Sequence, residues 1–252
     1  MSDPPELAAA RDPDLDVPQA VRGLAGGDAV RPVWLNELGG LTCEVTGPAG
    51  RRFVKWAPHV PGLDLAAEAV RLTWAAAHIT VPRVLDQGAD GDGAWLVTAA
   101  LPGETAVSPR RVAAPATTVP ALGRALRALH DALPVDACPF TWSVAERVAE
   151  SPRDDAVALL DHPPVDRLVV CHGDACAPNT LLADDGTPTG HVDLGSLGVA
   201  DRWADLACRD VEHRVELRPR MGARAARGLR RGGRSGPHGA LPAAVGCRAL
   251  SR

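Results

Sequence analysis

The sequence contains no tyrosine and only two phenylalanines among its 252 residues, and six tryptophans are its remaining aromatic side chains. It also lacks an apolar run of the roughly 20 residues that a membrane-spanning helix needs. Residues 1–6 are acidic and do not form the charged and apolar pattern of a secretory signal peptide. We therefore expect a cytoplasmic protein with no membrane partner, in which the six cysteines stay reduced.

Two common site motifs are missing as well. A zinc site made from Cys171, His172, Cys176 and His191 would lack the C-x-x-C spacing of a zinc knuckle, and one proline-containing loop would supply most of its ligands. Ser196 follows a glycine directly, but it does not have both glycines at the spacing of the G-x-S-x-G nucleophile elbow, because position 194 is leucine. The sequence therefore predicts neither a zinc site nor a serine hydrolase.

The net charge of −4 hides an uneven distribution along the chain. Residues 207–252 hold eleven arginines against three acidic residues, which gives +8, so residues 1–206 carry −4 − 8 = −12. An acidic body attracts polycations, although an acidic surface also serves solubility alone. Only the arginine-rich end suggests nucleic acid, and we expect no nucleic-acid partner. The sequence does not indicate an oligomeric state.

A cluster of oxygen-bearing side chains organises the chain. Val169 and Val170 predict a short buried strand that runs into a turn at His172-Gly173-Asp174. Asn179 follows five positions after Asp174, and residues 180–182 and 189–192 predict a hairpin. Asp193 follows directly at the end of this hairpin. Rigid elements should thus deliver three polar side chains to one place.

This set of side chains suits phosphoryl transfer. One carboxylate accepts or orients the proton of the attacking hydroxyl, while an amide and a second carboxylate hold Mg²⁺ on the nucleotide phosphates. Asp174 fits the first role, and Asn179 and Asp193 fit the other two. The pattern H-G-D-x-x-x-x-N followed by D-x-G resembles the protein-kinase motifs H-R-D-x-x-x-x-N and D-F-G. The alternative is a loop and hairpin whose Asp and Asn residues only form turns.

Three segments carry a resemblance to a known family. Residues 171–179, 193–198 and 200–207, read as CHGDACAPN, DLGSLG and ADRWADLA, resemble the signature of the aminoglycoside phosphotransferases. Within the family the likeness is to the enzymes that phosphorylate streptomycin on its 3''-hydroxyl, and residues 136–140 and 169–174 support it. The resemblance covers roughly residues 28 to 207.

The resemblance implies an α+β, protein-kinase-like fold of two lobes, with an antiparallel sheet in the N-terminal lobe and mainly helices in the C-terminal lobe. It implies transfer of the γ-phosphate of ATP, with Mg²⁺, to an aminoglycoside hydroxyl, and hence antibiotic resistance. The partners are then ATP and an aminoglycoside. An acidic body is compatible with such a cationic substrate.

The N-terminal lobe should contain the nucleotide site. Residues 33–35 and 43–45 predict a hairpin around Gly39-Gly40, a turn that could cover phosphates, and further strands are predicted at residues 52–56, 81–85 and 94–98. Lys55 lies inside an apolar strand, where lysine is unusual unless paired. A helix is predicted to start near residues 63–64, with Glu68 in an early turn. In a kinase, a strand lysine contacts the α- and β-phosphates and a helix glutamate holds it, so Lys55 and Glu68 fit these roles.

The connection between the lobes is expected at residues 99–104. In the family, backbone groups of this hinge bind adenine, so the resemblance makes Thr98 and Ala100 candidates for cofactor binding. A long helix is expected over residues 119–133, with Thr118 as its N-cap. In this helix, we expect His130 to be a packing or surface residue. Further helices are predicted at 143–150 and 154–160. Asp205 should be structural, in a helix that opens at residue 201.

The predicted organisation has four parts. Residues 1–27 form a loose leader that can contain one short helix, residues 28–100 form the nucleotide-binding lobe, and residues 101–207 form the catalytic and substrate lobe. Residues 208–252 are Arg/Gly-rich and without pattern, and the resemblance stops at Ala207. This composition predicts either a disordered basic tail or a product of a shifted reading frame, and we favour the shifted frame. Two alternatives remain for function: a kinase of another cationic alcohol, or an inactive nucleotide- or drug-binding module.

Overall fold

The computed structural model describes residues 15–150 and 164–206, and it divides them into two compact units. The first unit comprises residues 15–102 and 190–195, and the second comprises 103–150, 164–189 and 196–206. The helix predicted at 154–160 and the tail predicted at 208–252 lie outside the described residues. Among the described helices, none is both long and apolar enough to cross a membrane.

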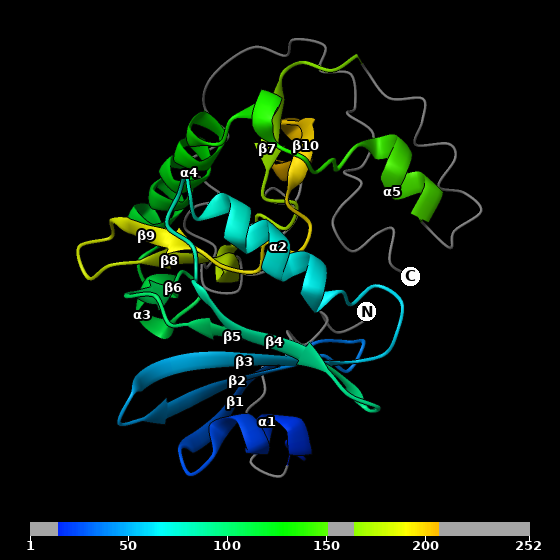
Figure 1. Cartoon of the computed structure of the whole chain (residues 1–252). Helices are drawn as coiled ribbons and strands as arrows, with labels where there is room; N and C mark the ends of the chain where they lie inside the picture. Colours follow the sequence, from blue (N-terminus) through cyan, green and yellow to red (C-terminus); the bar gives the residue numbers. More distant parts are fainter. Residues whose placement is uncertain (1–14, 151–163, 207–252) are drawn as a thin grey trace, which may run out of the picture. The chain divides into compact units, whose positions relative to one another are not determined.

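The first unit is built on a five-stranded antiparallel sheet with the order β1-β2-β3-β5-β4 (Figure 1). Its strands are β1 (Ala29–Leu35), β2 (Leu41–Gly47), β3 (Gly50–Pro58), β4 (Val84–Ala89) and β5 (Gly93–Ala99). The predicted hairpin around Gly39-Gly40 is confirmed as the turn between β1 and β2. The edge strand β4 begins at Val84 rather than at residue 81, because Pro82 has no N–H to donate to a strand ladder.

Two helices lie on opposite sides of this sheet (Figure 1). Helix α1 (Gln19–Ala25) buries Val21 and Ala25 against a core that also contains Cys43, Val45 and Val54. The short helix allowed for in residues 1–27 is therefore α1, but residues 15–27 are not loose, because their apolar side chains are part of the sheet's core. Helix α2 (Leu65–Ala75) packs against β4 and β5. It begins where predicted, because the Asp64 side chain accepts a hydrogen bond from the Ala67 N–H at 2.8 Å.

The second unit combines helices with two small sheets. Its helices are α3 (Pro109–Val112), α4 (Pro115–Ala132) and α5 (Val144–Glu150), with short 3₁₀ turns η1 (Val135–Ala137) and η3 (Ala177–Asn179). One sheet has the order β6-β8-β9, with β6 (Glu104–Thr105), β8 (Thr180–Leu182) and β9 (Pro188–His191), and the last two residues of β9 already belong to the first unit. The other pairs β7 (Leu168–Cys171) with β10 (Gly198–Asp201) in antiparallel register. The strand expected at Val169-Val170 and the hairpin after it are thus confirmed.

The structure corrects three details of this unit. Helix α4 begins at Pro115, and Thr118 does not cap it but donates its hydroxyl to the Arg111 carbonyl at 2.9 Å. Proline is well suited to the first helical turn, so the helix starts there. Asp201 ends strand β10 instead of opening a helix, which runs over residues 203–206. Strand β10 and helix α3 were not predicted, because each has only four residues and too little periodicity.

One further difference concerns residues 190–195, which were expected to belong to the lobe of residues 101–207 but belong to the first unit. The chain enters the first unit at Gly190, and the His191 N–H donates to the Thr80 carbonyl at 3.2 Å. A side chain at position 190 would lie 2.7 Å from this same carbonyl oxygen. Glycine at this position therefore permits the close approach that brings Asp193 into the first unit.

Candidate functional site

Lys55 lies at the centre of a charged cluster in the first unit. It follows the fully buried Val54 on β3, so the alternation of the strand turns its side chain to the other face of the sheet, toward α2. Its Nζ lies 2.6 Å from Oε1 of Glu68 and 2.8 Å from Oδ1 of Asp193. Three of the predicted site residues are thus brought together, although Lys55 and Asp193 are 138 positions apart in sequence.

The charges in this cluster keep the lysine protonated. Burial alone would lower the pKa of Lys55, but the carboxylates of Asp193 and Glu68 outweigh burial and hold this pKa above its ordinary value. Burial raises the pKa of the Glu68 carboxyl, and the opposing effect of Lys55 is smaller. Lys55 therefore offers a fixed positive charge, which is what an anionic ligand such as a triphosphate needs.

Asp193 differs from its two partners because it is partly open to solvent. Its side chain is 47% exposed, whereas that of Glu68 is 6% exposed. Its backbone is left-handed, with φ of 64°, the one such value among the non-glycine residues that the structure describes. This is an unusual conformation for a residue with a side chain, and such conformations concentrate at functional sites. A partly exposed carboxylate next to a lysine fits a ligand site better than a purely structural ion pair.

Asp174 and Asn179 are brought together in the second unit. Strand β7 ends at Cys171, and the chain then turns sharply through Gly173, which has φ of +85°. A Cβ at position 173 would lie 2.1 Å from the Ser196 carbonyl oxygen, so this turn requires glycine. The Asn179 Nδ2 donates to both the backbone oxygen and Oδ2 of Asp174, each at 3.0 Å. This leaves the amide oxygen of Asn179 as its possible metal ligand.

Thr98 and Ala100 lie at the end of β5 in the first unit. Thr98 is buried and pairs across the sheet with Phe53 on β3. The Ala100 N–H donates to the Arg51 carbonyl at 3.3 Å and so continues the ladder between β3 and β5. An adenine contact at this position would have to replace that hydrogen bond or use another backbone atom of the hinge. Adenine binding by these two residues stays a prediction.

Asp205 anchors the turn that carries Asp174. Its side chain is fully buried, and it accepts hydrogen bonds from the N–H groups of His172 at 2.8 Å and Gly173 at 3.0 Å. The Nε2 of His130 on α4 lies 2.8 Å from Oδ2 of the same carboxylate. Burial would raise the pKa of Asp205, but the hydrogen bond from His130 and the neighbouring His172 outweigh burial and lower it. The structural role expected for Asp205 is therefore confirmed by its contacts with this turn.

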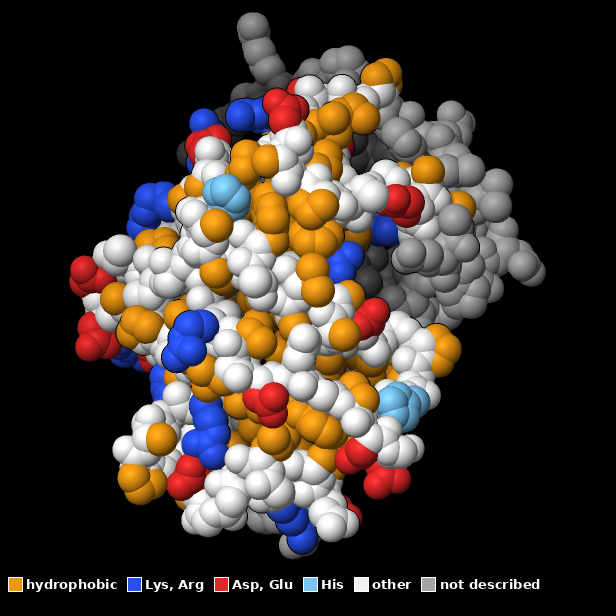
Figure 2. All heavy atoms as spheres, in the orientation of Figure 1, with side chains coloured by type: hydrophobic (Ala, Val, Ile, Leu, Met, Phe, Trp, Pro, Cys, Tyr) orange, Lys and Arg blue, Asp and Glu red, His pale blue; other side chains and the backbone are white. Residues whose placement is uncertain are grey.

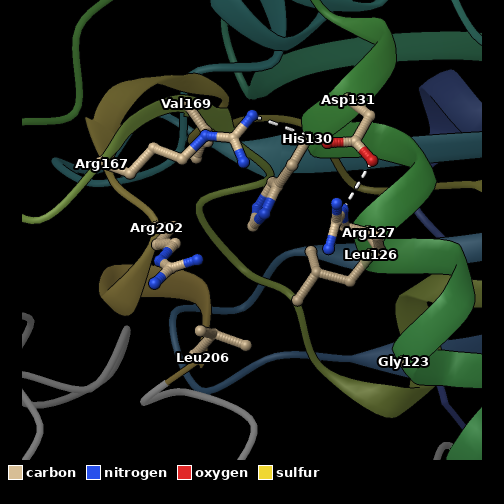
Figure 3. A pocket seen from close by; sticks show the side chains of 9 residues that line it. All are labelled: Gly123, Leu126, Arg127, His130, Asp131, Arg167, Val169, Arg202 and Leu206. Carbon is tan, nitrogen blue, oxygen red and sulfur yellow. Dashed lines mark hydrogen bonds and ion pairs between the residues drawn. The ribbon is translucent and has the colours of Figure 1, made fainter.

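The contact made by His130 was not predicted. Its side chain is only 8% exposed, and Figure 3 shows it in the wall of a small cavity of about 190 Å³, beside the ion pair of Arg127 and Asp131. His130 and Asp205 are 75 positions apart, so no local pattern could have revealed their contact. Cys171 also lies near this pair, but burial raises the pKa of its thiol. Burial therefore favours the neutral form of this thiol.

We expect Asp205→Ala to destabilise the protein strongly. The substitution leaves two buried backbone N–H groups and His130 without their shared acceptor, and breaking a buried pair typically costs about 3–5 kcal/mol. The free energy of unfolding from denaturant titration measures this loss. Asp131→Ala is the matched control: it removes a half-exposed carboxylate from an ion pair on the neighbouring helix, which is worth less than about 1 kcal/mol. Equal losses in the two variants would contradict the anchoring role of Asp205.

Comparison with known protein families gives a match over most of the chain. The model of the "Phosphotransferase enzyme family" matches residues 36–237. This match extends beyond Ala207, so the expectation that the resemblance ends there is wrong. That expectation followed from the composition of residues 208–237, and composition takes no account of the order of the residues. The predicted shifted reading frame stays a prediction.

Curated relatives agree with this match. The chain is 39% identical to an aminoglycoside 3'-phosphotransferase from Streptomyces fradiae, in an alignment that covers 74% of this chain and 81% of the relative. It is 35% identical to a streptomycin 3''-kinase from Streptomyces griseus, with 62% of this chain and 68% of the relative covered.

Solved structures show the same fold. An aminoglycoside-3'-phosphotransferase of type VIII superposes with a TM-score of 0.62 at 35% identity, over 77% of this chain and 81% of that one. The aminoglycoside phosphotransferase APH(3'')-Id from Streptomyces rimosus, in complex with ADP and streptomycin, superposes with a TM-score of 0.55 at 28% identity, over 77% and 80%. The fold is thus the predicted α+β, protein-kinase-like one, and the chain belongs to the phosphotransferase enzyme family as an aminoglycoside phosphotransferase.

Proposed function

We propose that this enzyme transfers the γ-phosphate of ATP, with Mg²⁺, to a hydroxyl group of an aminoglycoside antibiotic. The observation that carries this proposal is the position of Lys55 between Glu68 and Asp193. Lys55 supplies a protonated amine for the α- and β-phosphates, and the buried Glu68 holds this amine in place. Asp193 supplies a partly exposed carboxylate beside the amine. The complex of the Streptomyces rimosus relative with ADP and streptomycin supports both a nucleotide and an aminoglycoside as ligands.

The donor set fits a magnesium ion. Mg²⁺ prefers oxygen ligands and usually binds one or two carboxylates together with phosphate oxygens and water. In this proposal Asp193 of the first unit would supply a carboxylate oxygen to the ion, and Asn179 of the second unit would supply an amide oxygen. When bound, Mg²⁺ neutralises charge on the phosphates of the nucleotide. The hydrogen bonds from Asn179 Nδ2 to Asp174 fix the side chain so that its oxygen, not its nitrogen, remains for the metal.

Asp174 acts on the substrate hydroxyl. Its carboxylate accepts the hydrogen bond of the attacking hydroxyl and takes its proton as the new oxygen–phosphorus bond forms and the bond to the leaving β-phosphate oxygen breaks. Asp205 and Gly173 keep the backbone of this turn fixed, so that the carboxylate does not have to be ordered during the reaction.

Two candidate positions of phosphorylation follow from different observations. The motif resemblance favours the 3''-hydroxyl of streptomycin, and the 35% identity to a streptomycin 3''-kinase supports it. The 39% identity to an aminoglycoside 3'-phosphotransferase favours a 3'-hydroxyl instead. The surface in Figure 2 does not favour either hydroxyl position, because acidic and basic side chains of the described residues are interspersed on the face that it shows. Every aminoglycoside is cationic, so charge alone does not distinguish the two classes.

An assay of the purified chain with ATP and Mg²⁺ tests this proposal. The acceptors are streptomycin, an aminoglycoside with a 3'-hydroxyl, and the 3'-deoxy analogue of the latter. Turnover with streptomycin supports the 3''-position, whereas turnover with the second acceptor but not with its 3'-deoxy analogue supports the 3'-position. Phosphorylation of a simple cationic alcohol and of no aminoglycoside would overturn the proposed substrate class. Nucleotide or drug binding without any turnover would leave the inactive binding module as the function.

A further inference from the structure

A small cavity of the second unit brings three arginines together. It has a volume of about 190 Å³, and Arg127, Arg167 and Arg202 line it from separate parts of the chain. Arg127 lies on α4, Arg167 directly precedes β7, and Arg202 directly follows β10. The pairing of Leu168 with Asp201 places the last two side by side, and the Arg202 N–H donates to the Arg167 carbonyl at 2.9 Å. The fold thus gathers three cations that no local motif connects.

The nearby carboxylates leave part of this positive charge unmatched. Among the described residues that line the cavity, Asp131 is the single acidic one. Its carboxylate lies 2.6 Å from Nε of Arg127 and 3.7 Å from a terminal nitrogen of Arg167. Arg202 is paired with Asp166, which does not line the cavity, at 2.5 Å. Within the described part of the chain, the terminal nitrogens of Arg127 and all side-chain nitrogens of Arg167 donate no hydrogen bond, so they are available to a ligand.

The shape of the cavity suits a small oxyanion. Figure 3 shows the guanidinium groups of the three arginines arranged around the His130 ring. A guanidinium offers a planar fork of N–H donors that matches the oxygens of phosphate or sulfate. The volume far exceeds the roughly 30 Å³ that one water takes in the liquid, so a tetrahedral oxyanion fits. Pockets for drug-sized ligands hold about 300–1,000 Å³, so a nucleotide or an aminoglycoside is too large.

We propose that this cavity is a binding site for a free inorganic oxyanion of the size and charge of phosphate. The anion joins α4 to the ends of β7 and β10, and it offsets the repulsion among three like charges. This site goes beyond the proposed function and does not depend on it, because it uses neither Lys55 nor Asp174 nor Asp193.

The bound anion also steadies the turn that carries the proposed general base. His130 lines the cavity and lies 2.8 Å from Oδ2 of Asp205, which accepts the N–H groups of His172 and Gly173. Local opening of the turn breaks these contacts. An anion that ties α4 to the sheet of β7 and β10 opposes such opening, so amide exchange of His172 and Gly173 should become slower.

The test is a titration of the full chain with inorganic phosphate at constant ionic strength, followed by NMR of the arginine Nε–H groups. Sodium chloride is the blank, because it screens charge without offering a tetrahedral oxyanion. A few charge-assisted contacts at a partly open site should give a dissociation constant on the order of 1 mM. Sulfate, which has the same shape, should compete with phosphate. Hydrogen exchange of His172 and Gly173 is measured with and without saturating phosphate.

Two substitutions in the cavity should have opposite effects. Arg167→Gln removes one cation and should weaken phosphate binding by about 3- to 10-fold. Asp131→Asn removes the carboxylate that competes with the anion, and it should strengthen binding by about 2- to 5-fold. Arg124→Gln is the matched control, because Arg124 is an exposed arginine on the same helix that does not line the cavity. It should leave the affinity within about twofold of the wild type, and so should Lys55→Ala.

Several results would overturn this site. One is a chloride blank that shifts the arginine signals as phosphate does. Others are an unchanged affinity in Arg167→Gln, an equal loss in Arg124→Gln, or weaker binding in Asp131→Asn. Phosphate binding that is lost in Lys55→Ala would place the anion at the candidate nucleotide site instead. Phosphate binding that leaves the exchange of His172 and Gly173 unchanged would overturn the link to the turn. Turnover does not enter any of these measurements, so a failure of the proposed reaction would be seen separately.

Discussion

Asp174→Asn should abolish most phosphate transfer and leave nucleotide binding intact. The substitution preserves the size of the side chain but removes the carboxylate that accepts the proton of the substrate hydroxyl. General-base assistance is typically worth about 10²–10⁴-fold in rate, so kcat with a saturating aminoglycoside should fall by that factor. The affinity for Mg²⁺-ATP should change little, because Lys55, Glu68 and Asp193 make their contacts in the first unit, without Asp174.

Asp184→Asn is the matched control for this prediction. Asp184 also belongs to the second unit, its side chain is 98% exposed, and its contact is an ion pair with Arg110 at the surface. The same chemical change at this position should leave kcat within about twofold of the wild type, because exposed ion pairs contribute little. Near-normal turnover by Asp174→Asn would remove Asp174 from the mechanism. Loss of nucleotide binding in that variant would instead mean that the turn had been disturbed.

The sequence predicted best those elements whose signals are local. The strands of the first sheet, the turn at Gly39-Gly40 and the start of α2 at the Asp64 cap each depend on a few adjacent residues, and the structure confirms them. The contact between Lys55 and Glu68 could be expected only because a strand lysine and a helix glutamate in this order resemble a kinase. Their roles in binding a nucleotide stay predictions.

The missed features depend on pairs that are distant in sequence. His130 was expected to be a packing or surface residue, and only the fold brings it to Asp205, 75 positions later. Strand β10 has four residues, and it is a strand because β7 pairs with it. The role of Asn36 in the β1–β2 turn was missed for another reason. Its Oδ1 accepts the N–H groups of Leu38 and Gly40, and a glycine pair predicts a turn without indicating which side chain will occupy the space beside it.

Asp193→Ala should weaken Mg²⁺-ATP binding and turnover together. Asp193 has two functions in the proposed site, since it contacts Lys55 at 2.8 Å and offers a carboxylate to the metal. A metal ion at a phosphoryl group contributes several kcal/mol of charge stabilisation, so its loss should reduce kcat on the order of 10²–10⁴-fold. The decisive measurement is the affinity for ATP with and without Mg²⁺. In the wild type Mg²⁺ should strengthen binding, and in Asp193→Ala it should not.

Glu68→Gln separates the two functions of Asp193, because Glu68 is the other partner of Lys55. Its side chain is 6% exposed and holds the amine at 2.6 Å, yet it has no place among the proposed metal ligands. This variant should bind ATP more weakly, because Lys55 is held less firmly, but Mg²⁺ should still strengthen binding as in the wild type. If Mg²⁺ strengthens binding equally in Asp193→Ala, then Asp193 is only an ion-pair partner of Lys55. The metal would then have to be held by the nucleotide and Asn179 alone.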